Sequence, residues 1–146
     1  NSILVVCTGN ICRSPYAEAK LRSMMLDRRI MSVGIATNTS QLEGAPAAPL
    51  AVKVAADMGL DISSHRAKQV TQQLVDDFDL ILAMERNQLD KLCEMHPNAR
   101  HKVFLFGHWI GLSTIEDPYQ KNEATFRQVF INIDRAADAW AKKIND

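Results

Sequence analysis

The chain alternates short apolar runs with longer amphipathic segments. Short runs rich in β-branched residues, without polar alternation, are typical of strands buried on both faces of a parallel sheet. Such runs predict four strands, at residues 2–6, 30–36, 78–83 and 102–106. Apolar residues at helical spacing, with proline and glycine at segment ends, predict helices at residues 15–29, 49–58, 85–95 and 122–144. Residues 37–47 and 108–121 are expected to be loops.

Strands that alternate with helices indicate a parallel sheet with right-handed crossovers and helices on both faces. The predicted fold class is therefore α/β, with a four-stranded parallel sheet. A length of 146 residues fits a single domain, residues 1–146. In such sheets ligands bind beyond the carboxyl ends of the strands, so chemistry is expected in the segments that follow them.

The segment Cys7–Ser14 follows the first strand directly and leads into Pro15, where a helix is expected to start. A loop entering a helix presents unpaired N–H groups and positive potential, which suit a phosphate group. Gly9 allows close approach of the backbone, and Asn10 tolerates a left-handed conformation. The planar guanidinium of Arg13 matches two phosphate oxygens. These residues predict a phosphate-binding loop after the first strand.

Cys7 stands at the base of this loop and is predicted to be a nucleophile. Helix N-termini and nearby cations favour the thiolate form of cysteine. A thiolate that attacks phosphorus forms a cysteinyl-phosphate, which water then hydrolyses. Ser14 is placed to donate a hydrogen bond to the thiolate. A cysteine that is merely buried at a strand end would not require the glycine, asparagine, arginine and serine that follow it.

A general acid is expected in the segment Asp117–Tyr119, which reads Asp-Pro-Tyr. Pro118 stiffens the segment and restricts the residue before it to extended conformations. A carboxylate held in this way can protonate a leaving oxygen and later deprotonate water. Tyr119 is placed to form a wall for an aromatic substrate. The neighbouring Glu116 is a second candidate for the acid.

Together, Cys-x5-Arg-Ser near the N-terminus and the distant Asp-Pro-Tyr resemble the low-molecular-weight protein tyrosine phosphatases. The resemblance extends over essentially the whole chain and includes the segment at residues 59–68. The segment at residues 105–109 and the long last helix are most similar to bacterial members tied to exopolysaccharide and capsule production.

The resemblance implies roles for individual residues. Cys7 would be the nucleophile, Arg13 would bind phosphate, and Asp117 would be the acid and base. Substrate-binding residues would be Thr8, Gly9, Asn10, Ile11, Cys12, Ser14, Leu42 and Tyr119. Ser32 and His65 would support the loop, with Asn10 bonded to Ser14, Ser32 and His65. Cys12 would form a reversible, protective disulfide with Cys7 under oxidation. No metal or other cofactor is implied.

Composition limits the classes of partner and the cellular compartment expected for the protein. Seventeen basic and seventeen acidic residues give zero formal net charge, so no global field recruits nucleic acid or a membrane surface. No apolar run approaches the roughly 18 residues of a membrane span, and no membrane insertion is expected. Three cysteines and a catalytic thiolate favour the reducing cytoplasm. The resemblance implies a phosphotyrosine protein as partner, in particular a bacterial tyrosine kinase, and a monomer or weak dimer.

Three alternatives stay open at this point. Protein-arginine phosphatases resemble this chain but carry threonine at the position of Ile11. Arsenate reductases of the same fold use further cysteines after the third strand, where this chain has only Cys93. A non-catalytic phosphate-binding module would require neither the thiolate of Cys7 nor the acid of Asp117.

Overall fold

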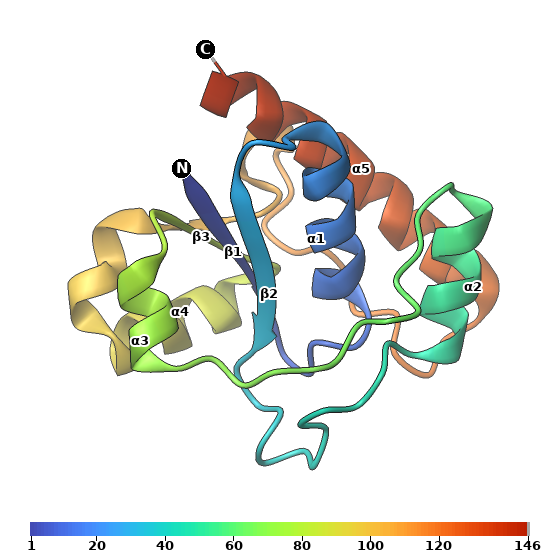
Figure 1. Ribbon diagram of the computed structural model, residues 1–146, viewed down its shortest axis with the longest axis horizontal. Helices are drawn as coiled ribbons and strands as arrows, with labels where there is room; N and C mark the ends of the chain where they lie inside the picture. Colours follow the sequence, from blue (N-terminus) through green and yellow to red (C-terminus); the bar gives the residue numbers. More distant parts are fainter. Residues whose placement is uncertain (146) are drawn as a thin grey trace.

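The computed structural model describes residues 1–145 and contains one parallel sheet covered by helices (Figure 1). The strands are β1 Ser2–Cys7, β2 Arg29–Gly34, β3 Leu80–Ala83 and β4 Val103–Leu105, in the order β2-β1-β3-β4. The helices are α1 Arg13–Met24, α2 Pro49–Asp57, α3 Gln72–Asp77, α4 Arg86–Met95 and α5 Glu123–Asn145. Two 3₁₀ turns, η1 Pro97–Lys102 and η2 His108–Ile110, flank β4. The predicted α/β class with a four-stranded parallel sheet is confirmed.

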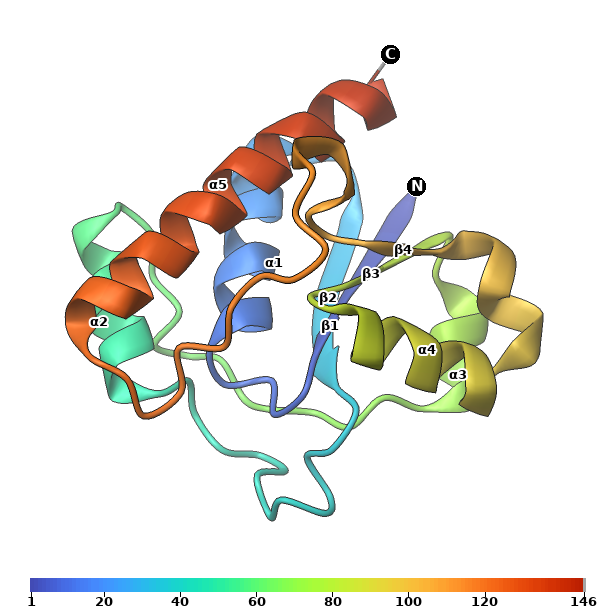
Figure 2. The same cartoon turned by 180° about the vertical axis from the view of Figure 1, so that it is seen from behind.

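The apolar run of β1 is buried because both faces of the sheet are covered. Ile3 and Val5 belong to the cluster shared with α1, α2 and α5, whereas Leu4 and Val6 belong to the cluster shared with α3 and α4. Figures 1 and 2 show α1 and α5 on one side of the sheet and α3 and α4 on the other. Because β1 pairs with both β2 and β3, it is a central strand, and its carboxyl end at Cys7 lies between the ends of two neighbouring strands.

Helix α5 lies along α1 and completes the larger core cluster. The rings of Tyr16 and Phe130 stack with centroids 4.1 Å apart, and the Tyr16 hydroxyl donates a hydrogen bond to Asp134 at 2.8 Å. These contacts hold α1, and with it the loop that precedes it. None of the helices formed by residues 1–145 has the length and apolar composition needed to cross a lipid bilayer.

Several predictions of secondary structure differ from the structure. β2 ends at Gly34 instead of residue 36, and β3 begins at Leu80 instead of residue 78. The first helix begins at Arg13, two residues before Pro15, because the loop passes directly into helical backbone. It ends at Met24, so residues 25–28 form a turn and β2 begins at Arg29. Helix α3 was not predicted, since its six residues are too few to show a periodic pattern. Its signal is local: the side chain of Thr71 caps it by accepting a bond from the Leu74 N–H at 3.2 Å.

The carboxyl ends of β1, β3 and β4 converge on one edge of the sheet. After β4 the chain returns along the end of β3, where the Ile115 N–H donates to the Met84 carbonyl at 2.8 Å. Glu85 also pairs with Thr114 in an isolated antiparallel bridge. These backbone bonds fix the segment after β4 beside the loop at Cys7–Ser14.

Candidate active site

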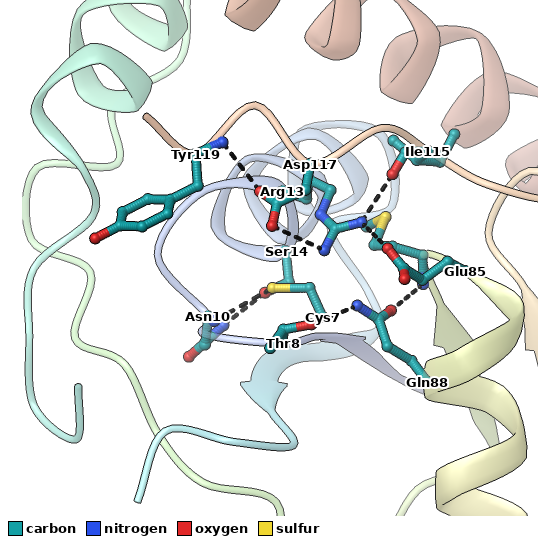
Figure 3. A network of polar contacts seen from close by, with 11 residues as sticks. Cys7, Thr8, Asn10, Arg13, Ser14, Glu85, Gln88, Ile115, Asp117 and Tyr119 are labelled. Atoms are coloured by element: carbon teal, nitrogen blue, oxygen red, sulfur yellow. Dashed lines mark hydrogen bonds and ion pairs between the residues drawn. The ribbon is translucent and has the colours of Figure 1, made fainter. Parts of the chain in front are cut away.

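The Cys7 side chain lies buried at the base of the loop between β1 and α1 (Figure 3). Its Sγ accepts a hydrogen bond from the Asn10 N–H at 3.2 Å and lies 2.9 Å from the Ser14 Oγ. Asn10 adopts the left-handed conformation, with φ of 57°. This conformation turns the backbone so that its N–H points toward the sulfur, an arrangement that stabilises negative charge on Cys7.

Asn10 is held in this conformation by four neighbours. Its Nδ2 donates to the Ser14 Oγ at 2.7 Å and to the Ser32 Oγ at 3.0 Å. Its Oδ1 accepts from the Lys68 N–H at 3.0 Å, and its carbonyl lies 2.7 Å from the His65 Nε2. Burial lowers the pKa of His65, which favours a neutral ring whose Nε2–H donates to this carbonyl. The side chains of Ser14, Ser32 and His65 therefore all contact Asn10, although His65 bonds the backbone.

Arg13 is almost completely buried, and its guanidinium is oriented by partners from two other segments. Nη1 donates to the Glu85 Oε2 and to the Ile115 carbonyl, both at 2.8 Å. Nη2 lies 3.7 Å from the Asp117 Oδ2. Because Nη1 is engaged by Glu85 and Ile115, the rest of the guanidinium faces the cavity above Cys7 (Figure 3).

Asp117 lies opposite the loop, with its side chain about half exposed, at 48%. Its Oδ1 accepts a hydrogen bond from the Tyr119 N–H at 3.0 Å, which orients the carboxylate around the buried Pro118. Glu116 is exposed and does not line the cavity, whereas Asp117 does. Of the two carboxylates that the sequence leaves as alternatives for the acid, only Asp117 lies at the cavity.

A cavity of about 200 Å³ opens above the Cys7 sulfur. Its lining comprises Cys7, Thr8, Gly9, Asn10, Ile11, Cys12, Arg13, Ser40, Leu42, Asp117 and Tyr119. Leu42 and Tyr119 come from different loops and form apolar parts of the wall. Ser14, Ser32 and His65 do not line this cavity and contact the loop from behind.

Cys12 is the second cysteine of the loop, and it too is buried. Burial, together with the charges of Cys7 and Asp117, raises the pKa of the Cys12 thiol to about 12, against the opposing effect of Arg13. Cys12 is therefore a neutral thiol at ordinary pH. Cys93 lies in the core cluster on the opposite face of the sheet, against α4.

Sequence reasoning missed three residues of the site, Ser40, Glu85 and Gln88. The buried Gln88 donates from Nε2 to the Thr8 Oγ1 at 3.1 Å and accepts from the Met84 N–H at 2.9 Å. Glu85 lies between β3 and α4 and Gln88 lies near the start of α4, so the rule that places ligands beyond the carboxyl ends of strands could have found them. Among residues 1–145, no group of three or more histidine, cysteine, aspartate or glutamate side chains is arranged to hold a metal ion.

Comparison with known proteins assigns this constellation to a family. The sequence model described as low molecular weight phosphotyrosine protein phosphatase matches residues 2–146. The chain belongs to this family. The curated phosphatase Wzb of Escherichia coli K12, named as a low molecular weight protein-tyrosine-phosphatase, is 43% identical over 145 residues, which cover 99% of this chain and 96% of Wzb.

Solved structures agree with this family assignment. Vibrio vulnificus Wzb in complex with benzylphosphonate superposes on the phosphatase with a TM-score of 0.95 and 43% identity, covering 98% of each chain. The YwlE arginine phosphatase from Geobacillus stearothermophilus superposes with a TM-score of 0.90 and 29% identity, covering 99% of this chain and 92% of YwlE. The fold is thus shared by phosphatases named for tyrosine and for arginine.

Proposed function

We propose that this phosphatase hydrolyses phosphotyrosine in proteins through a cysteinyl-phosphate, and that residues 1–146 form one catalytic domain. The observation that carries the proposal is the arrangement around the cavity. The Cys7 sulfur lies at its base, and Arg13 Nη2 and Asp117 Oδ2 face each other at 3.7 Å. Nucleophile, phosphate-binding cation and acid therefore surround a space large enough for a phosphoryl group.

In the first step the loop N–H groups and Arg13 bind the phosphate oxygens. The Cys7 thiolate attacks phosphorus, and the bond between phosphorus and the phenolic oxygen breaks. Asp117 donates its proton to that oxygen, so that tyrosine leaves as a neutral phenol. The phosphoryl group remains on the Cys7 sulfur.

In the second step Asp117, now a carboxylate, takes a proton from water as the water oxygen attacks phosphorus. The phosphorus–sulfur bond breaks, and Cys7 leaves as a thiolate. Ser14 and the Asn10 N–H, at 2.9 Å and 3.2 Å from the sulfur, stabilise the charge that returns to it. Inorganic phosphate is released and Asp117 is protonated again.

The walls of the cavity favour an aromatic ester. Leu42 and Tyr119 present apolar surface on which a phenyl ring can pack. Ile11 offers only apolar contact at the position where arginine phosphatases carry threonine. The higher identity to Wzb than to YwlE points in the same direction. These features support tyrosine over arginine as the phosphorylated residue.

Arsenate reduction is less well supported by the positions of the thiols. A thiol relay requires further cysteines that can reach Cys7. Cys93 lies in the core cluster on the face of the sheet opposite that of Cys7. Cys12 lies beside Cys7 but is a buried neutral thiol.

The physiological setting is also part of the proposal. We propose that the substrate is a bacterial tyrosine kinase of exopolysaccharide or capsule production and that the phosphatase acts in the cytoplasm as a monomer or weak dimer. The resemblance to Wzb and to AmsI of Erwinia amylovora, named as a probable low molecular weight protein-tyrosine-phosphatase, supports this setting. The need for reduced Cys7 supports the compartment.

Hydrolysis of matched phosphotyrosine and phosphoarginine peptides, with chelator present, tests the proposal. We expect turnover of phosphotyrosine by the wild type and none by Cys7→Ser, which should still bind phosphate. Turnover of phosphoarginine alone would contradict the assigned substrate, and residual turnover by Cys7→Ser would contradict the assigned nucleophile.

A further inference from the structure

Behind the loop, a chain of hydrogen bonds runs from the surface of α1 to the Cys7 sulfur. The Ser32 hydroxyl donates to the Glu18 Oε1 at 2.6 Å, and the Asn10 Nδ2 donates to the Ser32 Oγ at 3.0 Å. The same Nδ2 donates to the Ser14 Oγ at 2.7 Å, and that oxygen lies 2.9 Å from the Cys7 Sγ. Glu18 is the outer end of this chain.

The direction of each bond follows from the number of hydrogens available. A carboxylate only accepts, so Glu18 takes the single hydroxyl hydrogen of Ser32. Ser32 can then only accept from Asn10. The two hydrogens of the Asn10 amide are used by Ser32 and Ser14, so the Ser14 oxygen is an acceptor on that side. The single hydroxyl hydrogen of Ser14 is then available for the Cys7 sulfur.

We propose that Glu18 is a positioning residue of the phosphatase: by holding Ser32 as an acceptor, it helps to hold the Asn10 amide in the orientation that keeps Ser14 as a donor to the Cys7 thiolate. The inference rests on the proposed function, since it concerns the same nucleophile. The Lys68 N–H, at 3.0 Å from the Asn10 Oδ1, fixes the orientation of the amide independently. Loss of Glu18 should therefore weaken the chain without abolishing it.

The position of Glu18 suits this role. Its side chain is 19% exposed, and it lines a surface groove between α1 and residues 60–65 together with His65 and Arg22. Its second oxygen, Oε2, pairs with Arg22 Nη2 at 3.2 Å. Ser32 and Arg22 thus contact different oxygens of one carboxylate, which makes the two contacts separable by mutation.

Kinetics of Glu18→Ala, Ser32→Ala and the double variant test the proposal. One net hydrogen bond corresponds to a three- to tenfold effect, so we expect Glu18→Ala to lower kcat by about that factor with little change in KM. The double variant should be no slower than Ser32→Ala, because Glu18 acts through Ser32. Glu18→Gln retains an oxygen that can accept from Ser32 and should recover most of the activity.

Arg22→Ala is the matched control, since it removes the ion pair of Glu18 and the two hydrogen bonds from Arg22 to the Ile30 carbonyl, at 3.0 and 2.7 Å, but leaves the bond from Ser32 to Glu18 in place. We expect it to keep the wild-type kcat even if Tm falls. A loss equal to that of Glu18→Ala would assign the effect to the contacts of Arg22 instead of the bond from Ser32, and would overturn the proposal. If the losses of kcat in Glu18→Ala and Ser32→Ala multiplied in the double variant, the two residues would act independently and the proposal would be overturned. A Glu18→Ala variant as active as wild type would overturn it as well.

The rate of Cys7 alkylation by iodoacetate keeps this test separate from the choice of substrate. Alkylation reports the thiolate itself and requires no phosphorylated residue. If wild type failed to hydrolyse phosphotyrosine, the proposed function would fail. A slower alkylation of Glu18→Ala than of Arg22→Ala would nevertheless support the positioning role, and equal rates would contradict it.

Discussion

Arg13 Nη1 donates a hydrogen bond of 2.8 Å to the carbonyl of Ile115, two residues before the proposed acid Asp117. The phosphate-binding arginine therefore also fixes the segment that carries the carboxylate. Glu85 accepts from the same nitrogen at 2.8 Å, so three segments meet at one guanidinium. The geometry between Asp117 and the loop depends on Arg13 remaining in this position.

Glu85→Ala should therefore impair the enzyme although Glu85 does not line the cavity. A hydrogen bond to a charged partner contributes about 1.5–3 kcal/mol, so kcat/KM should fall by roughly ten- to hundredfold. The inhibition constant of inorganic phosphate should rise as well, because Arg13 loses its orientation. Steady-state kinetics with phosphate as inhibitor measures both effects.

Glu116→Ala is the matched control for Glu85. Glu116 is an exposed carboxylate in the segment that holds Asp117, and no change beyond about twofold is expected for a surface substitution of this kind. A Glu85→Ala enzyme with wild-type kcat/KM would show that Ile115 alone orients the guanidinium.

Asp117→Asn should slow the hydrolysis of esters in proportion to the basicity of the leaving group. General acid catalysis contributes about 10²- to 10⁴-fold, and this contribution is needed most by a phenolate that is a poor leaving group. Phenyl phosphate should therefore lose far more activity than an ester of an acidic nitrophenol. Equal losses on both esters would show that another group is the acid.

The sequence predicts the part of this site that is contiguous. Cys7 and Arg13 could be placed because a strand, a loop and a helix follow each other without interruption, and local backbone chemistry determines what such a loop binds. Asp117 required more, since Asp-Pro-Tyr alone is an ordinary turn sequence. Asp117 could be proposed as the acid only because the sequence also contains the Cys7–Ser14 loop and resembles the phosphatase family.

The contacts that orient these residues could not be predicted in the same way. Glu85 lies 72 positions from Arg13, and Gln88 lies 80 positions from Thr8, so both contacts depend on the order of strands in the sheet. That order, β2-β1-β3-β4, places β3 beside β1 although β2 follows β1 in sequence. Helix α3 was missed for a different reason, because six residues carry too little periodicity.

Gly34 is expected to tolerate no side chain. A Cβ there would lie 2.6 Å from the Thr8 carbonyl oxygen and 3.1 Å from the Asn10 nitrogen, both backbone atoms of the loop. Overpacking of this kind costs about 1–3 kcal/mol, so Gly34→Ala should lower Tm by roughly 3–10 °C. Since the displaced atoms belong to the loop, kcat should fall as well. Thermal unfolding and steady-state kinetics measure the two effects.

Gly111→Ala provides the comparison for Gly34. Gly111 has φ of 73° and open space around its Cα, so its replacement adds backbone strain without a collision. We expect a lower Tm with unchanged kcat. If Gly34→Ala lost stability but kept full activity, the close contact with Thr8 and Asn10 would not matter for the loop.

Cys12 should resist alkylation between pH 7 and pH 9 although it lines the same cavity as Cys7. Burial, the largest cause, raises the pKa of its thiol to about 12, so the reactive thiolate forms only as pH approaches that value. Iodoacetamide should add a single group, to Cys7, and mass spectrometry of the intact protein and its peptides would locate it. The Cys7→Ser variant should remain unlabelled over the same range, because burial of Cys12 does not depend on Cys7. An adduct located at Cys12, in the wild type or in Cys7→Ser, would show that this thiol is more accessible than its 4% exposure indicates.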